Sequence, residues 1–182
     1  MVSHRALLNL RGNRPRSRGQ ALVEFSLVAT ILFFLMLGIL ESGLLLFVVG
    51  TARFGAGEVA RQESESGNAA NADQVSIAVL RATAIGTTNL GSVSEVDIFR
   101  LIQQANGTLT QDVAHINKYT LAGTAIGATP WPPSMRNVVN GQSDFLGVTV
   151  FYKYNWKTGV FLSTSPLSLQ QTFEIRLEPQ TY

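Results

Sequence analysis

The sequence contains no cysteine and only two histidines, His4 and His115. A chain without thiols forms no disulfide, has no cysteine nucleophile and lacks most of the ligand sets that bind structural zinc. Charged residues are also scarce, at 14% of the chain, and the first 23 residues contain no aspartate or glutamate. These shortages argue against thiol and metal chemistry, and they mark the N-terminus as a purely basic segment.

Catalytic motifs are absent as well. Residues 55–60 match the GxGxxA pattern of dinucleotide sites, but they follow an apolar helix and not a strand. Residues 141–145 begin like a nucleophile elbow, yet the closing glycine is missing and no histidine follows. His115, close to Asp112 on an expected strand, is interpreted as a surface or edge residue. We therefore expect no enzyme activity, no cofactor and no metal.

The most informative feature that is present is a long apolar run. Residues 21–40 contain one charged side chain, Glu24, and about 20 residues at ~1.5 Å each match a bilayer core of roughly 30 Å. After Glu41 and Ser42 the apolar pattern resumes to Gly50. The helix is thus longer than one bilayer, so it must tilt, protrude or pack against another element.

Charge predicts the orientation of this span. The N-terminal flank carries only basic side chains, at Arg5, Arg11, Arg14, Arg16 and Arg18. The far flank mixes arginines with glutamates, so the positive-inside rule predicts a cytoplasmic N-terminus and an extracytoplasmic C-terminal domain. Because these five arginines produce the basic excess (sequence pI about 9.2), we interpret it as a topology signal and expect no nucleic-acid partner.

Three interpretations of the N-terminal region compete. The first is a cleaved secretory signal ending near residues 50–52, although the apolar core exceeds the usual ~7–15 residues. The second is an uncleaved anchor, in which Glu24 is favoured by the helix dipole and Glu41 marks the outer membrane interface. The third takes the order Gly19-Gln20-Ala21-Leu22-Val23-Glu24-Phe25 as one motif for proteolytic processing.

That motif resembles the processing site of type IV pilin-like precursors. Residues 19–43, GQALVEFSLVATILFFLMLGILESG, resemble more narrowly the N-terminal signature of the TadE-like family, the minor pseudopilins of the tight-adherence (Flp) pilus system. In that family a second glutamate lies close to a glycine, as Glu41 does here. The residue between them is often aromatic in the family, whereas this chain has Ser42.

The resemblance implies a function for each residue of the motif. A prepilin peptidase would cut after Gly19, where a glycine lets the backbone lie extended. Gln20 would become the new N-terminus, and its amine would neutralise Glu24 of a neighbouring subunit, with Phe25 beside it. Glu41 would make a second subunit contact. The implied partners are the peptidase, other pseudopilins, the major Flp pilin, the inner-membrane assembly platform and the lipid bilayer.

The remaining pattern predicts an α+β protein with a pilin-like plan. We expect a leader over residues 1–19, a transmembrane and stalk helix over 20–64, and an exported head over 65–182. A second helix from Asn71 to Gly86 is expected to bury one apolar face. That face comprises Val75, Ala78, Val79, Ala82 and Ile85.

The head is expected to contain an antiparallel sheet of about four strands. The expected strands are residues 95–102, 112–120, 147–156 and 169–178, with a hairpin turn at Asn106-Gly107 and a loop over 121–144. Four aromatic residues either fill the core or form a contact surface. They are Trp131, Tyr152, Tyr154 and Trp156.

Overall fold

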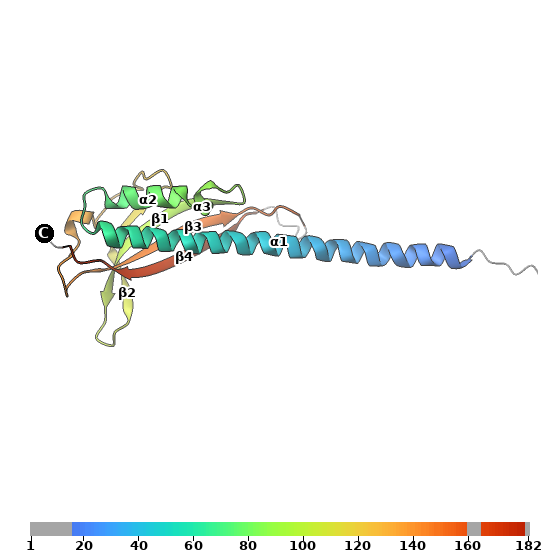
Figure 1. The fold of residues 1–182 in the computed structure, drawn as a ribbon, viewed down its shortest axis with the longest axis horizontal. Coiled ribbons are helices and arrows are strands. Elements are labelled where there is room, and N and C mark those ends of the chain that lie inside the picture. The colour runs from blue at the N-terminus through green and yellow to red at the C-terminus, as the bar shows by residue number, and fades with distance from the viewer. Residues whose placement is uncertain (1–15, 160–164, 181–182) are drawn as a thin grey trace, which may run out of the picture.

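The computed structural model describes residues 16–159 and 165–180, and it contains one long helix and an α+β head (Figure 1). The elements in chain order are α1 (Arg16–Ser66), α2 (Ala72–Ala82), α3 (Ala84–Thr87), β1 (Gly91–Gln103), β2 (Leu109–Tyr119), the 3-10 helix η1 (Pro133–Met135), β3 (Phe145–Tyr154) and β4 (Leu167–Arg176). The predicted fold class is confirmed.

Helix α1 has 51 residues, which corresponds to roughly 75 Å of helix. Its C-terminal part lies along the sheet beside α2, and its N-terminal part projects beyond the head (Figure 1). The helix begins at Arg16, four residues before the predicted start at Gln20, so the end of the expected leader is already helical. Residues 1–15 of that leader lie outside the described residues.

The four strands form one antiparallel sheet in the order β2-β1-β3-β4. The predicted hairpin joins β1 to β2, and its turn contains Gly107 at φ +85°, a conformation that favours glycine. The Asn106 side chain accepts a hydrogen bond from the Thr108 backbone N–H at 3.0 Å, which fixes the turn. The β1–β2 register shifts between Phe99 and Leu101, and this hairpin extends away from the rest of the head in Figure 1.

The core lies between the sheet and the three helices. One stripe of α1 contributes small residues that recur every three or four positions: Val48, Ala52, Ala56, Val59 and Ala60. Alanines at this spacing let α1 approach its neighbours closely. The approach is tightest at Gly55, where an added Cβ would lie 2.7 Å from Leu80 of α2.

The predicted core face of β3 is confirmed, because Val148, Val150, Tyr152 and Tyr154 are all buried in this core, although Thr149 on the opposite face is buried as well. Trp131 is also buried, and Trp156 packs against the core while partly exposed. The core interpretation of these four aromatic residues is therefore confirmed.

The predicted buried face of the second helix is wrong. Val75 and Ala78 are exposed, and the buried residues of α2 are Ala72, Asp73, Ser76, Ile77 and Leu80. The pattern of apolar residues predicted the wrong face because two polar residues, Asp73 and Ser76, lie on the buried face of α2. Asp73 forms several hydrogen bonds there. The helix also ends at Ala82, and Ile85 is buried from the separate short helix α3.

Candidate functional site

The predicted processing motif lies in the first turns of α1. Gly19 and Gln20 are both helical and exposed, and nothing in the chain lies within 4 Å of a Cβ built on Gly19. A peptidase binds an extended backbone, so cleavage here requires the first turn of the helix to unwind. Glycine lowers the free energy needed for this unwinding, because it is a poor helix former.

Glu24 lies one helical turn after Gln20. The Gln20 side-chain amide donates a hydrogen bond to Glu24 Oε1 at 2.9 Å, and both side chains are exposed. Phe25 is 71% exposed. The structure thus brings Gln20 and Glu24 together within one chain and leaves Phe25 exposed, so this end of α1 is accessible to lipid or to another helix.

The exposed face of the apolar segment is continuous. Apart from Leu37, the large apolar side chains over residues 22–40 are about half exposed or more: Leu22, Val23, Phe25, Leu27, Val28, Ile31, Leu32, Phe33, Phe34, Leu35, Met36, Ile39 and Leu40. The helix is long and apolar enough to cross a membrane. Such a surface is stable in hydrocarbon and unfavourable in water, so this part of α1 is a candidate single membrane span.

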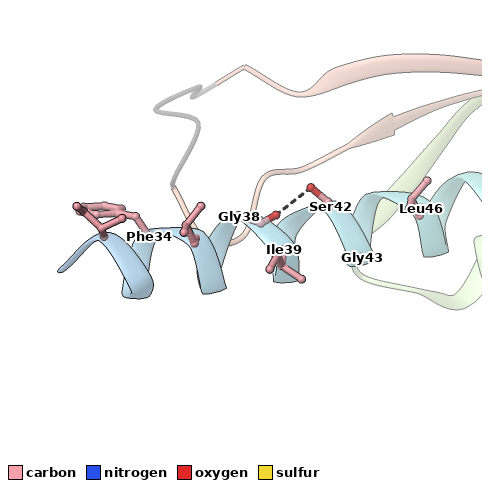
Figure 2. A pocket seen from close by; sticks show the side chains of 8 residues that line it. Phe34, Gly38, Ile39, Ser42, Gly43 and Leu46 are labelled. Atoms are coloured by element: carbon pink, nitrogen blue, oxygen red, sulfur yellow. Dashed lines mark hydrogen bonds between the residues drawn. The ribbon is translucent and has the colours of Figure 1, made fainter. Parts of the chain in front are cut away.

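One groove of about 800 Å³ runs along this span (Figure 2). Eight residues line it: Ile31, Phe34, Leu35, Gly38, Ile39, Ser42, Gly43 and Leu46. The Ser42 hydroxyl donates to the Gly38 carbonyl oxygen at 2.9 Å, so its polar group is satisfied inside the helix. Small residues at the floor of the groove let another helix approach closely, as they do between membrane helices.

Glu41 is placed differently from Glu24. It is fully buried, at the junction between the apolar span and the head. Its carboxylate accepts hydrogen bonds from the Tyr154 hydroxyl, from the Lys157 backbone N–H at 3.1 Å, and from the backbone N–H and hydroxyl of Thr158, both at 2.6 Å. These donors come from the end of β3 and the loop that follows it. Glu41 therefore connects α1 to its own head.

The sequence pattern does not reveal these partners of Glu41. They lie 113 to 117 residues away along the chain, and two of the donors are backbone N–H groups, which carry no residue signature. Alternation predicts that Tyr154 lies on the buried face of its strand, but it does not reveal where the hydroxyl will point.

A second buried polar cluster fixes the other end of α1, and the sequence analysis also missed it. Arg136, from the loop before β3, contacts Glu63 of α1 at 2.5 Å and also Asp73 of α2. Asp73 accepts further hydrogen bonds from Tyr119 at 2.6 Å and Asn117 at 3.1 Å. All of these side chains are buried, so the cluster joins α1, α2, β2 and the long loop.

The protonation of this cluster follows from its charges. Burial raises the pKa of Glu63 to about 7, since the attraction of Arg136 only partly offsets the loss of water and nearby Asp73 adds repulsion. One guanidinium shared by two buried carboxylates cannot neutralise both. Burial and the hydrogen bond to Asp73 also raise the pKa of Tyr119.

Within residues 16–159 and 165–180, no group of three or more histidine, cysteine, aspartate or glutamate residues is arranged to hold a metal ion. His115 contacts Asp112 at 2.7 Å on the edge strand β2, where the sequence analysis placed it. The absence of a cofactor stays an expectation.

The fold and the site together define a class: a candidate single-span membrane protein with a long N-terminal helix and an α+β head. The family model described as TadE-like protein matches residues 19–61, so the resemblance predicted from the motif is confirmed over that segment. No curated protein and no solved structure matches the chain. The TadE-like segment associates the protein with the tight-adherence, or Flp, pilus system and with the membrane.

Proposed function

We propose that this protein is a minor pseudopilin of tight-adherence pilus biogenesis, made as a precursor and cut after Gly19 by a prepilin peptidase. One observation carries the proposal: the TadE-like match begins at the glycine of the processing motif and extends through the whole apolar span into the head-bound part of α1. The partners are other pseudopilins, the major Flp pilin and the inner-membrane assembly platform.

The proposed orientation follows from the charge of the leader. Arginines precede Gly19 and mixed charges follow the span, so the peptidase site faces the cytoplasm and the head is extracytoplasmic. Cleavage removes the basic leader and creates an amine at Gln20. In a bundle of such helices this amine neutralises Glu24 of a neighbour, which makes a carboxylate tolerable in hydrocarbon.

The fold is incompatible with a secretory cut near residues 50–52, but it is compatible with an uncut anchor. A secretory cut near residues 50–52 would fall in the middle of α1, where Ala52 is fully buried in the head core. Such a cut would separate the head from part of its own core. An uncut anchor that carries an exported binding domain has the same fold as the proposed pseudopilin, and only processing distinguishes the two.

The proposal is tested with two variants in a piliated host strain that lacks the native gene. Gly19→Leu is expected to block processing, since a Cβ and a bulky side chain hinder the extended backbone at the peptidase. Glu24→Ala is expected to be processed and to reduce piliation. A native protein that keeps its leader, together with normal piliation of Glu24→Ala, would contradict the proposal and favour the uncut anchor.

A further inference from the structure

A second groove lies at the level of the head, between α1 and the edge strand β4. It has a volume of about 550 Å³ and is lined by Gly50, Arg53, Phe54, Gly57, Glu58, Arg61, Phe173 and Ile175. Phe54 is 61% exposed and Phe173 is 41% exposed. The groove therefore presents aromatic surface beside the head, C-terminal to the apolar run of residues 21–50.

The helical side of this groove has the geometry of a helix-packing site. Gly50, Arg53, Phe54 and Gly57 are spaced i, i+3, i+4 and i+7, which is the four-residue hole that receives one side chain of a parallel helix. A Cβ on Gly50 would meet nothing within 4 Å, and one on Gly57 would meet only the Phe173 ring, at 3.5 Å. The fold of the single chain thus requires glycine at neither position.

The charges in the groove indicate what occupies it. Arg61 is paired with Glu58 at 3.0 Å and with Glu65 at 2.5 Å. Arg53 is exposed and makes no hydrogen bond or ion pair with any residue that the structure describes. The groove therefore has one uncompensated cation beside two exposed aromatic rings, and it is complementary to an apolar helix that carries one carboxylate.

The chain itself contains such a helix. Over residues 22–28 the apolar side chains are exposed, Glu24 is the one charged group, and its one hydrogen bond to a residue that the structure describes is with Gln20. We propose that, once assembly has moved it out of the membrane, this segment of a second copy docks in the head-level groove, parallel to α1, with Glu24 on Arg53 in place of the Gln20 amine that neutralises it in hydrocarbon. Phe25 then lies over the space left by Gly50 and Gly57.

The register of this docking is defined. Placing residue 24 of one copy beside residue 53 of the other shifts the two helices by about 29 residues, or roughly 43 Å. This shift exceeds the roughly 30 Å hydrocarbon core of a bilayer. The inference therefore rests on the proposed function, because a second copy reaches this register only if assembly moves its helix along the membrane normal.

Cysteine crosslinking tests the register directly, because the native chain contains no cysteine. Two differently tagged copies are co-expressed in the piliated strain, one with Phe25→Cys and the other with Gly57→Cys, and the cells are oxidised. The matched control replaces Gly57→Cys with Val113→Cys, a position 82% exposed on the β1–β2 hairpin. We expect a crosslinked pair from positions 25 and 57 and none from 25 and 113. Equal yields, or no product at position 57, would overturn the docking.

The charge pair is tested with a double-variant cycle on the same crosslink. Glu24→Gln and Arg53→Gln are each expected to lower the yield by about threefold, the size expected for a partly exposed ion pair. The double variant is expected to fall no further than either single variant, and Arg61→Gln is expected to have a smaller effect because Arg61 has partners of its own. Additive losses from Glu24→Gln and Arg53→Gln would refute the pairing.

The N-terminus of the protein in these samples separates the two proposals. A processed protein in piliated cells without the 25–57 crosslink overturns the docking and leaves the proposed function standing. An unprocessed protein without the crosslink overturns both.

Discussion

The two halves of α1 differ in what their side chains contact. Toward the N-terminus, from residue 22 to residue 40, large apolar side chains are exposed and no carboxylate is buried. From Val48 to Glu63 the helix buries small apolar residues against its own sheet and α2, and the buried Glu63 is part of a charged cluster. The first half is therefore suited to lipid and other chains, and the second to its own head, with Glu41 at the boundary.

The largest effect in this comparison is expected from the buried polar cluster that Arg136 forms with Glu63 and Asp73. Asp73→Ala removes an acceptor of Arg136, Tyr119 and Asn117, all buried, and should lower the free energy of unfolding of the head by about 3–5 kcal/mol. Urea unfolding in detergent, followed by Trp131 fluorescence, measures this loss. The control Glu58→Ala breaks only an exposed pair with Arg61 and should change it by less than ~1 kcal/mol. A loss no larger than that of the control would show that the cluster does not stabilise the head.

The two glutamates of α1 give the next largest contrast. Glu41→Ala leaves the donors from Tyr154, Lys157 and Thr158 without their acceptor, so we expect a loss of about 2–3 kcal/mol. The backbone amides of Lys157 and Thr158 should then exchange hydrogen faster. Glu24→Ala should leave both stability and exchange unchanged, since Glu24 is exposed. Unchanged exchange in Glu41→Ala would mean that this residue does not hold the head on the helix.

A smaller effect is expected from pH. The pKa of Glu63 is raised to about 7 in the folded protein, whereas in the unfolded chain it keeps its ordinary value near 4.5. Between pH 4.5 and pH about 7 the folded protein keeps a proton on Glu63 that the unfolded chain has lost. The stability that this proton contributes is therefore complete below pH 4.5 and is lost as the pH rises to about 7. Burial also raises the pKa of Asp97, to about 6, so Asp97 acts in the same direction.

Glu63→Gln isolates this pH contribution, because a glutamine cannot titrate. We expect unfolding curves of the native protein to show lower stability at pH 7.5 than at pH 5, and the variant to lose part of that difference. A variant with an unchanged pH profile would place the titration on other groups.

The smallest and most specific contrast comes from two glycines of α1. Gly55→Ala places a Cβ at 2.7 Å from Leu80, so it should destabilise the head by about 1–3 kcal/mol. Gly50→Ala meets open space and should stabilise the helix by about 0.5–1 kcal/mol. Thermal unfolding of the two variants shows whether each substitution raises or lowers the stability of the protein. The same sign for both would contradict the assignment of Gly55 to the packed face and Gly50 to the open one.

Local patterns predicted much of this fold. The length and composition of the apolar run, the core face of β3 and the Asn106-Gly107 turn each depend on residues close in sequence, and all agree with the structure. The TadE-like resemblance could be recognised for the same reason, because residues 19–25 are contiguous and the family match begins at the same glycine.

The contacts that hold the two ends of α1 could not be predicted in this way. Arg136 lies 73 residues from Glu63 and 63 residues from Asp73, in a loop whose sequence only indicated irregular structure. Asp73 and Ser76 also made the buried face of α2 appear polar, so the apolar pattern selected the wrong side. Buried polar groups that bond across the fold contradict local patterns, and only the three-dimensional arrangement shows their partners.

The proposed function requires that the chain is processed between Gly19 and Gln20 and acts through the exposed half of α1. Mass spectrometry of the N-terminal peptide from protein extracted from native membranes tests it most directly. The account predicts a peptide that begins at Gln20 and lacks the arginine-rich leader. A peptide that begins at Met1 in cells with normal pili, or one that begins near Arg53, would contradict it.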